Sequence, residues 1–151
     1  MEKEVLCTLL EAGLKAPTAT NKQEIHITVV SRDNPVQAEI QQDLNPAVAP
    51  GTFFYNAPVT MYLSADESFK WSPVDCGIAV ENIHLAANAL GLGSVILGCM
   101  EKVLNGEKKQ QYAEKLAFPQ GYKYYIAIAV GYPETEKAQH EINVEKDVTI
   151  L

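Results

Sequence analysis

A helix without a polar face constrains this chain more than any other segment. The run Ser72-Pro73-Val74-Asp75 is a strong helix start, because it offers a capping hydroxyl, a proline at the first helical position and an acid in the first turn. The residues that follow, up to about Leu90, are nearly all small or apolar, and Gly91 can end the helix in the left-handed conformation. A helix that is apolar around most of its girth has to be buried, so we expect residues 73–90 at the centre of a domain or of an oligomer.

Shorter segments on both sides of this helix alternate between helical and strand patterns. The expected helices are residues 4–15, 34–44 and 105–117. The expected strands are residues 25–30, 59–63, 94–97 and 122–130. The stretch 45–58 carries three prolines and a glycine, which predicts a loop. Helices that alternate loosely with strands are typical of the α/β and α+β classes.

Composition excludes several classes of protein. The chain has 151 residues, of which 47% are hydrophobic and 21% charged, so we expect one globular domain that needs no disulfide. The formal net charge of −7 argues against nucleic-acid binding and against a polybasic membrane anchor. Glycines and an asparagine interrupt the apolar stretch around 83–100, so no membrane span is expected. We therefore expect a cytoplasmic protein.

Neither the cysteines nor the basic residues form a site by themselves. Cys7, Cys76 and Cys99 lie far apart without a CxxC pair, and the histidines are equally scattered, so no metal site is expected. Arg32 is the only arginine among the 12 basic residues. Because arginine binds phosphate or carboxylate with two parallel hydrogen bonds, an anionic ligand of this chain must rely on lysine, backbone N–H groups or hydroxyls.

Residues 134–151 read as an extension of the domain that residues 1–133 form. They are polar as far as Val144 and end in Val-Thr-Ile-Leu at 148–151, a run with strong strand propensity. A single short strand is not stable alone. We therefore expect the extension to add to a sheet edge, either of its own chain or of a partner subunit.

Several segments together resemble the nitroreductase family of FMN-dependent oxidoreductases. Residues 16–23, Ala-Pro-Thr-Ala-Thr-Asn-Lys-Gln, precede a strand and resemble the family's Ala-Pro-Ser-x-x-Asn-x-Gln element. Residues 57–59, Ala-Pro-Val, lead the next strand. Residues 75–98 are similar to the family's long central helix, its Ala-Leu-Gly-Leu-Gly-Ser cap and the glycine-bearing loop after the following strand. Residues 129–133 match the closing strand and turn, so the resemblance covers residues 5–133 in order.

This resemblance implies an α+β fold in which helices flank a mixed sheet, and an intertwined homodimer with two FMN sites at the subunit interface. It also implies the chemistry. NAD(P)H reduces the flavin, and the flavin then reduces a nitroaromatic, a quinone or a similar small-molecule acceptor. The flavin ring carries these steps, so no catalytic side chain is expected and the protein supplies placement and electrostatics.

The resemblance further implies which residues contact the cofactor. Backbone N–H groups of the loop 96–99 would hydrogen-bond flavin N5, and Gly98 would let the backbone approach the ring. Pro17 and Thr18 would pack on the ring, from the same subunit or from its partner. Polar side chains later in the same loop would bond the ribityl chain or the pyrimidine. The implied cofactor-binding residues are Pro17, Thr18, Thr20, Asn21, Gln23, Ile96, Leu97, Gly98 and Cys99.

The chain departs from the family pattern at the positions where the family has positive charges that contact FMN. The Arg-Arg-Ser-x-Arg segment that the family places before the first helix has no counterpart in this sequence, and the first basic residue after the closing strand is Lys137. The family's Gln-Pro-Trp is replaced by Gln23-Glu24-Ile25. Since a buried phosphate without a cation is costly, FMN is expected to bind weakly, to bind through Lys22 or Lys137, or not to bind.

Two alternative functions follow from these departures. One is a nitroreductase-fold protein with weak or no flavin binding, which acts as a binding or structural module. The other is a different enzyme on the same scaffold, such as a reductive dehalogenase or a flavin-consuming enzyme. A bound flavin in the purified protein would favour the FMN-dependent oxidoreductase.

Overall fold

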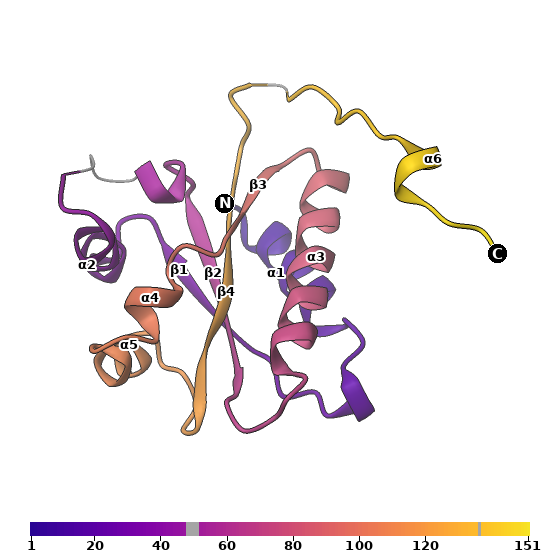
Figure 1. The fold of residues 1–151 in the computed structure, drawn as a ribbon. Helices are drawn as coiled ribbons and strands as arrows, with labels where there is room; N and C mark the ends of the chain where they lie inside the picture. The colour runs from indigo at the N-terminus through magenta and orange to yellow at the C-terminus, as the bar shows by residue number, and fades with distance from the viewer. Residues whose placement is uncertain (48–51, 136) are drawn as a thin grey trace.

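Four strands form one sheet at the centre of the protein. The structure is a computed structural model that describes residues 1–47, 52–135 and 137–151 (Figure 1). The spatial order of the strands is β1-β2-β4-β3. The strands are β1 (His26–Ser31), β2 (Val59–Asp66), β3 (Gly93–Leu97) and β4 (Tyr122–Gly131).

Each pair of neighbouring strands in this sheet is antiparallel. An antiparallel sheet with helices confirms the predicted α+β class. The mixed sheet implied by the family resemblance also needs a parallel neighbour, and none of the four described strands supplies one. A parallel neighbour would have to come from another segment and add to one of the two edge strands, β1 or β3.

Six helices and two short 3-10 turns are described around the sheet. The 3-10 turn η2 lies in the predicted loop 45–58, of which residues 48–51 fall outside the described residues. No helix in the described ranges is long and apolar enough to span a membrane. The helices are α1 (Lys3–Leu14), α2 (Pro35–Leu44), α3 (Ser72–Ala89), α4 (Glu101–Leu104), α5 (Lys109–Lys115) and α6 (Val144–Asp147), and the turns are η1 (Ala19–Asn21) and η2 (Thr52–Phe54).

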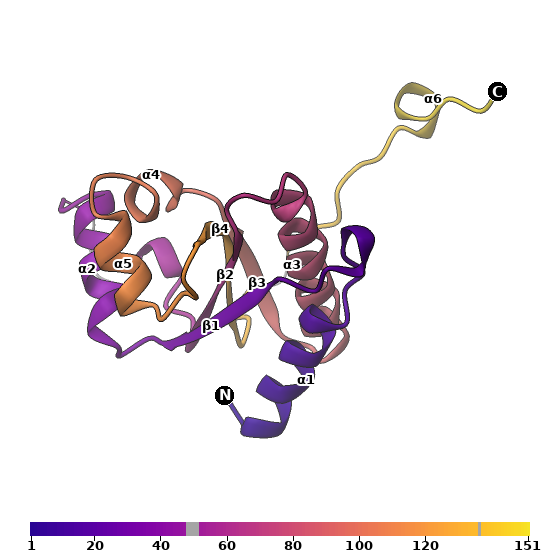
Figure 2. The same ribbon diagram turned by 90° about the horizontal axis from the view of Figure 1, so that it is seen from below.

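Helices cover both faces of the sheet. α1 and α3 lie on one face, whereas α2, α4 and α5 lie on the other (Figures 1 and 2). Strand β2 contributes to both cores because its side chains alternate between the two faces. Met61 and Leu63 are buried in the cluster with α1 and α3, and Tyr62 is buried in the cluster with the other three helices.

Helix α3 forms where the sequence predicts it, with one change at its start. Trp71 rather than Ser72 is the capping residue. The Ser72 hydroxyl donates to the backbone carbonyl of Asp66 at 2.7 Å, which ties the helix start to the end of β2. At the other end Gly91 has a φ of 73°, the left-handed conformation expected for a helix stop.

Only one side of α3 is buried by its own chain. That side packs on the sheet and on α1, so closely that a Cβ atom at Gly13 would lie 2.9 Å from the Ile83 side chain. On the opposite side Val74 and Leu85 are 49% and 57% exposed. The sequence predicts that this helix is buried in a domain or an oligomer, and the single chain provides only part of that burial.

The helix predicted over 105–117 is shorter in the structure, where α5 covers residues 109–115, and the preceding helix α4, at residues 101–104, lies before the predicted range. α4 ends at Leu104 and α5 begins at Lys109. A Cβ atom at Gly106, in the turn between them, would lie 2.2 Å from the backbone carbonyl oxygen of Lys102. The turn therefore requires glycine, and the helix starts only after this turn.

The C-terminal extension runs away from the body of the domain (Figures 1 and 2). It contains α6, and its last residues, 148–151, do not form the expected strand in this chain. Its apolar side chains are exposed, with Ile142 at 82% and Ile150 at 91%. Sheet pairing of this extension remains a prediction.

Candidate functional site

The loop of residues 16–24 follows α1 and is anchored to the first turns of α3. The backbone N–H of Ala19 donates to both carboxylate oxygens of Asp75, at 3.0 and 3.1 Å. Asp75 is 1% exposed, so this charge-assisted hydrogen bond is shielded from water. Asp75 was expected to act as a first-turn acid that faces the helix dipole, and its contact with Ala19 adds a tertiary role.

The same loop holds an unusual backbone conformation. Thr20, Asn21 and Gln23 have φ angles of 56°, 54° and 54°, which side chains other than glycine rarely adopt. Each such residue costs about 1–3 kcal/mol and persists only where surrounding contacts fix it. Here the Gln23 backbone N–H donates to the Thr18 hydroxyl at 3.0 Å, and the Gln23 side-chain amide donates to Asn21 at 3.2 Å. The polar residues predicted to contact the cofactor are thus held in one ordered loop.

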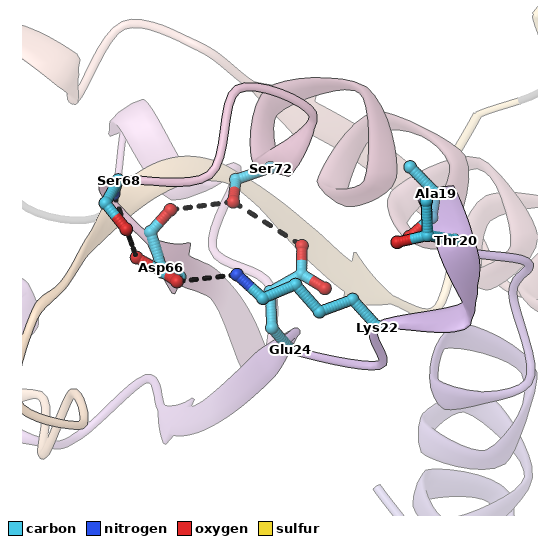
Figure 3. Close-up of polar contacts among 7 residues, drawn as sticks. All are labelled: Ala19, Thr20, Lys22, Glu24, Asp66, Ser68 and Ser72. Atoms are coloured by element: carbon cyan, nitrogen blue, oxygen red, sulfur yellow. Dashed lines mark hydrogen bonds and ion pairs between the residues drawn. The ribbon is translucent and has the colours of Figure 1, made fainter.

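Lys22 forms a second link between this loop and the β2–α3 connection (Figure 3). Its ammonium lies 2.6 Å from the Asp66 carboxylate, and Ser68 donates to the same carboxylate through its backbone N–H at 2.9 Å and its hydroxyl at 2.7 Å. Hydrogen bonding to Lys22, followed by that to Ser68, lowers the pKa of Asp66 to about 2. Lys22 also lies 4.1 Å from the centre of the Phe69 ring. Its charge is therefore already neutralised within the chain.

Glu24, at the end of the loop, is a buried acid. In the sequence this residue stood out only as a departure from the family pattern. It is 6% exposed, and its Oε1 lies 3.4 Å from the Ser72 hydroxyl, which makes its shorter bond to Asp66 (Figure 3). Its Oε2 has no hydrogen-bond partner among the described residues. Burial, and then the charges of Glu24 and Asp75, raise the pKa of the neighbouring Cys76 thiol to about 12.

The second predicted segment is the turn that connects β3 to α4. The Tyr124 hydroxyl donates to the backbone carbonyl of Leu97 at 2.7 Å and fixes the end of the strand. The backbone N–H groups of Gly98 and Cys99 have no acceptor among the described residues. Ile96 and Cys99 are exposed, while the Leu97 side chain is buried toward the α4 side. The turn therefore presents two free backbone donors to its surroundings.

The side of Gly98 on which a side chain would stand is open. A Cβ atom at this position would meet nothing within 4 Å, and Gly98 has no left-handed φ that would require glycine. The chain's own fold therefore does not explain the glycine. An open side next to two free backbone donors is what the ring of a flavin needs for close approach.

The two predicted segments lie far apart within one chain. The loop 16–24 stands beside the first turns of α3, on the face of the sheet that α1 and α3 cover (Figures 1 and 2). The turn at Gly98 leads into α4, on the opposite face. Each segment alone supplies only part of the contacts that the resemblance implies.

Comparison with known proteins settles the family. The sequence pattern that characterises the nitroreductase family matches residues 1–132 of this chain. The chain belongs to the nitroreductase family. The family predicted from the sequence is thereby confirmed, and with it the prediction of an oxidoreductase.

Relatives within the nitroreductase family are similar over most of the chain. A protein of Archaeoglobus fulgidus, provisionally named NADH dehydrogenase/NAD(P)H nitroreductase, is 33% identical over 138 residues, which are 88% of this chain and 75% of that protein. An FMN-dependent nitroreductase of Clostridium difficile R20291 is 31% identical with a TM-score of 0.80, and the match covers 99% of this chain and 89% of that one. A nitroreductase with bound FMN from Desulfitobacterium hafniense DCB-2 has a TM-score of 0.86 at 23% identity, over 100% of this chain and 88% of that one, and shows the shared fold.

Sequence reasoning proposed both candidate segments but missed most of the residues that hold the first one in place. Asp75 and Asp66 contact the loop through side chains that lie far away in the sequence, and Glu24, the last residue of the loop, contacts Ser72 with its buried carboxylate. Only the acid in the first turn of α3 carried a local signal, and that signal is typical of any helix start. The pairing of Ala19 with Asp75 could not be read from either residue alone.

Proposed function

We propose that this chain binds FMN and passes electrons from NAD(P)H to a nitroaromatic, a quinone or a similar acceptor. The observation that carries the proposal is the open space at Gly98 beside the free N–H groups of Gly98 and Cys99. The names of the solved relatives, one FMN-dependent and one with bound FMN, support the same cofactor. The cytoplasmic location predicted from the sequence remains part of this proposal.

The residues of the chain would bind and orient the cofactor, and FMN when bound supplies the redox chemistry. Gly98 and Cys99 offer backbone donors, which hold a ring in place and do not titrate. The ordered loop 16–24 offers an apolar surface at Pro17 and polar groups on the residues after it. Because contacts with Asp75 and Asp66 fix this loop before any ligand arrives, little conformational entropy is lost on binding.

The phosphate of FMN needs a cation, and the structure favours one of the two lysines that the sequence offers. Lys22 is engaged by Asp66 and Phe69, so it would have to leave both to contact a phosphate. Lys137 is exposed in the extension and forms no ion pair within the described residues. We therefore favour Lys137 as the phosphate contact.

A homodimer completes this proposal, because the two predicted segments lie on opposite faces of one chain. In a dimer the loop 16–24 of one subunit can meet the Gly98 turn of the other. The exposed apolar side of α3 and the projecting extension both need a partner surface. We propose that two subunits pack along α3 and that each extension adds to a sheet edge of the other subunit.

The test begins with the purified protein. We expect a yellow protein with flavin absorption, or saturable quenching of FMN fluorescence on titration. We also expect oxidation of NADH or NADPH that depends on both FMN and an added acceptor such as menadione or nitrofurazone. A colourless protein that neither quenches FMN fluorescence nor oxidises NAD(P)H would contradict the proposal and favour the binding or structural module.

A further inference from the structure

A small cavity lies where the end of β1 meets α2, and we call it the β1–α2 cavity. It is bounded by the residues that follow β1, by the first turns of α2 and by the connection between η2 and β2. Its volume is about 190 Å³, which suits a ligand smaller than a typical drug or a flavin. None of its described lining residues belongs to the set implied for FMN binding. The lining includes Arg32, Asp33, Gln37, Phe54 and Asn56.

Gln37 is buried in this lining with half of its side-chain amide unused. The residue is 5% exposed, and its Oε1 accepts the Tyr62 hydroxyl at 2.5 Å. Its Nε2 has no hydrogen-bond partner among the described residues. Because buried polar groups are normally paired, the Nε2 donor requires an acceptor that the described part of the chain does not supply.

The start of α2 does not explain this amide. Gln37 is the third residue of the helix, where a capping box would use its side chain to accept the backbone N–H of Asn34. That N–H already donates to the backbone carbonyl of Ser31 at 3.0 Å. The Asn34 side chain caps the helix itself, because it accepts the backbone N–H of Val36 at 3.0 Å. The Gln37 side chain is therefore not needed to begin the helix.

Arg32, the only arginine of the chain, lines the same cavity and is loosely held. Its Nη1 lies 3.4 Å from the backbone carbonyl oxygen of Asn56, and its Nε lies 3.6 Å from the Asp33 carboxylate. Both distances are longer than those of a strong charge-assisted hydrogen bond. Neither contact uses Nη2. The guanidinium is therefore available for a carboxylate, which it can bind with two parallel hydrogen bonds.

Phe54 gives the cavity an apolar wall. This side chain is buried, and the turn that follows it is closed by a hydrogen bond from the Ala57 backbone N–H to the Phe54 carbonyl at 3.0 Å. Tyr55 and Asn56 in this turn have φ angles of 53° and 51°, a conformation that tyrosine rarely adopts. The cavity thus combines an apolar surface with a few polar groups, as small-molecule sites generally do.

We propose that the β1–α2 cavity binds a small organic carboxylate with an apolar body, such as a short-chain or aromatic acid. The Arg32 guanidinium binds the carboxylate, the Gln37 Nε2 donates to it, and the apolar body packs on Phe54. A cavity of this volume is only a few atoms across, so one ligand reaches all three side chains. The inference goes beyond the proposed function, because it involves neither FMN nor its electron donor.

Other classes of ligand fit this cavity less well. A flavin is too large for it. Inorganic phosphate suits Arg32 but leaves the wall at Phe54 without an apolar contact. An amine is disfavoured by Arg32, and Asp33 is the only acid among the described lining residues. Its side chain is 89% exposed, so water screens its charge.

The test uses the full chain, with benzoate as the probe. The side-chain amide of Gln37 gives its own signals in proton–nitrogen correlation NMR spectra, so it reports binding at the proposed contact. We expect benzoate to shift these signals saturably, with a dissociation constant of about 1 mM or lower. Benzamide has the same shape without the charge and should bind at least tenfold more weakly. Inorganic phosphate should also bind more weakly than benzoate.

Two variants of neighbouring residues should change benzoate binding in opposite directions. Arg32→Gln removes the cation and should raise the dissociation constant at least tenfold. Asp33→Asn removes the carboxylate that competes for Arg32 and should lower it. Both side chains are more than half exposed, so neither variant should lose its fold. Lys70→Gln, the matched control, removes a positive charge between β2 and α3 and should leave the dissociation constant unchanged.

A third variant tests the buried amide. Gln37→Glu keeps an acceptor for the Tyr62 hydroxyl but replaces the Nε2 donor with an acceptor, so benzoate binding should be lost. Circular dichroism checks that this variant folds. Because Gln37 is buried, Arg32→Gln and Asp33→Asn decide the outcome if it does not.

Several results would overturn the inference. One is a wild-type chain in which benzoate leaves the Gln37 signals unshifted. Another is equal weakening by Arg32→Gln and Lys70→Gln, which would show a general effect of charge. Binding of phosphate or benzamide as tight as that of benzoate would remove the carboxylate with an apolar body. None of these measurements needs FMN, so their failure leaves the proposed function intact, and a colourless protein leaves this inference intact.

Discussion

Both carboxylate oxygens of Asp75 accept the backbone N–H of Ala19, a residue 56 positions earlier in the chain. Replacing Asp75 by alanine should lower the free energy of unfolding by about 1.5–3 kcal/mol, because a buried donor loses its charged acceptor. Asp75→Asn retains one carbonyl acceptor and should cost less. Urea denaturation measures the stability, and hydrogen exchange of the Ala19 amide reports the contact. Unchanged protection of that amide in Asp75→Ala would show that the loop does not depend on this bond.

Gly98→Val tests the proposed cofactor contact. Because a Cβ atom at Gly98 meets nothing in the chain, the variant should keep the wild-type melting temperature. The branched side chain would fill the space that a flavin ring needs, so FMN retention should be lost. Gly98→Ala serves as the graded control and should weaken binding less. Undiminished flavin in Gly98→Val would remove this turn from the site.

The ion pair between Lys22 and Asp66 predicts a pH dependence of stability. The pKa of Asp66 falls from 3.8 to about 2 in the folded protein, mainly through its hydrogen bond to Lys22. A carboxyl group whose pKa is lowered by folding stabilises the fold at pH values above its pKa in the unfolded state. This contribution is lost as the pH falls from about 4 to about 2. In Lys22→Gln the carboxyl group should titrate closer to 3.8 by NMR, and the loss of stability between pH 4 and 2 should be smaller.

A matched control for this ion pair is Lys70→Gln, which removes the same charge nearby. Lys70 forms no ion pair within the described ranges and lies over the Trp71 ring. The Asp66 titration should therefore change little in Lys70→Gln. Equal shifts of the Asp66 pKa in the two lysine variants would attribute its low value to nearby positive charge in general rather than to the contact with Lys22.

The three cysteines should differ in reactivity. Cys7 and Cys99 are exposed, whereas Cys76 is buried and its thiol pKa is raised to about 12. Since the thiolate is the reactive form, iodoacetamide at pH 8 should label two cysteines in the native protein and all three after denaturation. Excess FMN should protect Cys99 and leave Cys7 labelled, as peptide mass spectrometry can show. Equal labelling of Cys99 with and without FMN would place the cofactor elsewhere.

Deletion of residues 140–151 tests the role of the extension. These residues are exposed and lie away from the body of their own chain, so an isolated subunit should not need them. If each extension adds to a sheet edge of the other subunit, the deletion should lower the melting temperature and shift the protein toward monomer or aggregate. Val148→Asp combined with Ile150→Asp keeps the length and should act in the same direction. An unchanged melting temperature would limit the extension to a surface role.

Local signals in the sequence determined where most elements form. The capping residues before α3 and the glycine after it act over a few positions, and the structure places both helix ends within one residue of the prediction. The β-branched and aromatic runs that become β2 and β4 are equally local. The family was also evident from sequence, because its motifs are short and their order is preserved along the chain.

Tertiary structure alone decided how these pieces meet. The buried positions of Asp75 and Glu24, and the contact between Lys22 and Asp66, depend on packing between segments that are distant in the sequence. The sequence indicated both candidate cofactor segments but could not show that they lie on opposite faces of the sheet. It also could not show that α3 keeps an open apolar side. The hydrophobic residues of a helix indicate only that its surface must be buried. The arrangement of helices and sheet determines which part of that surface a single chain can bury.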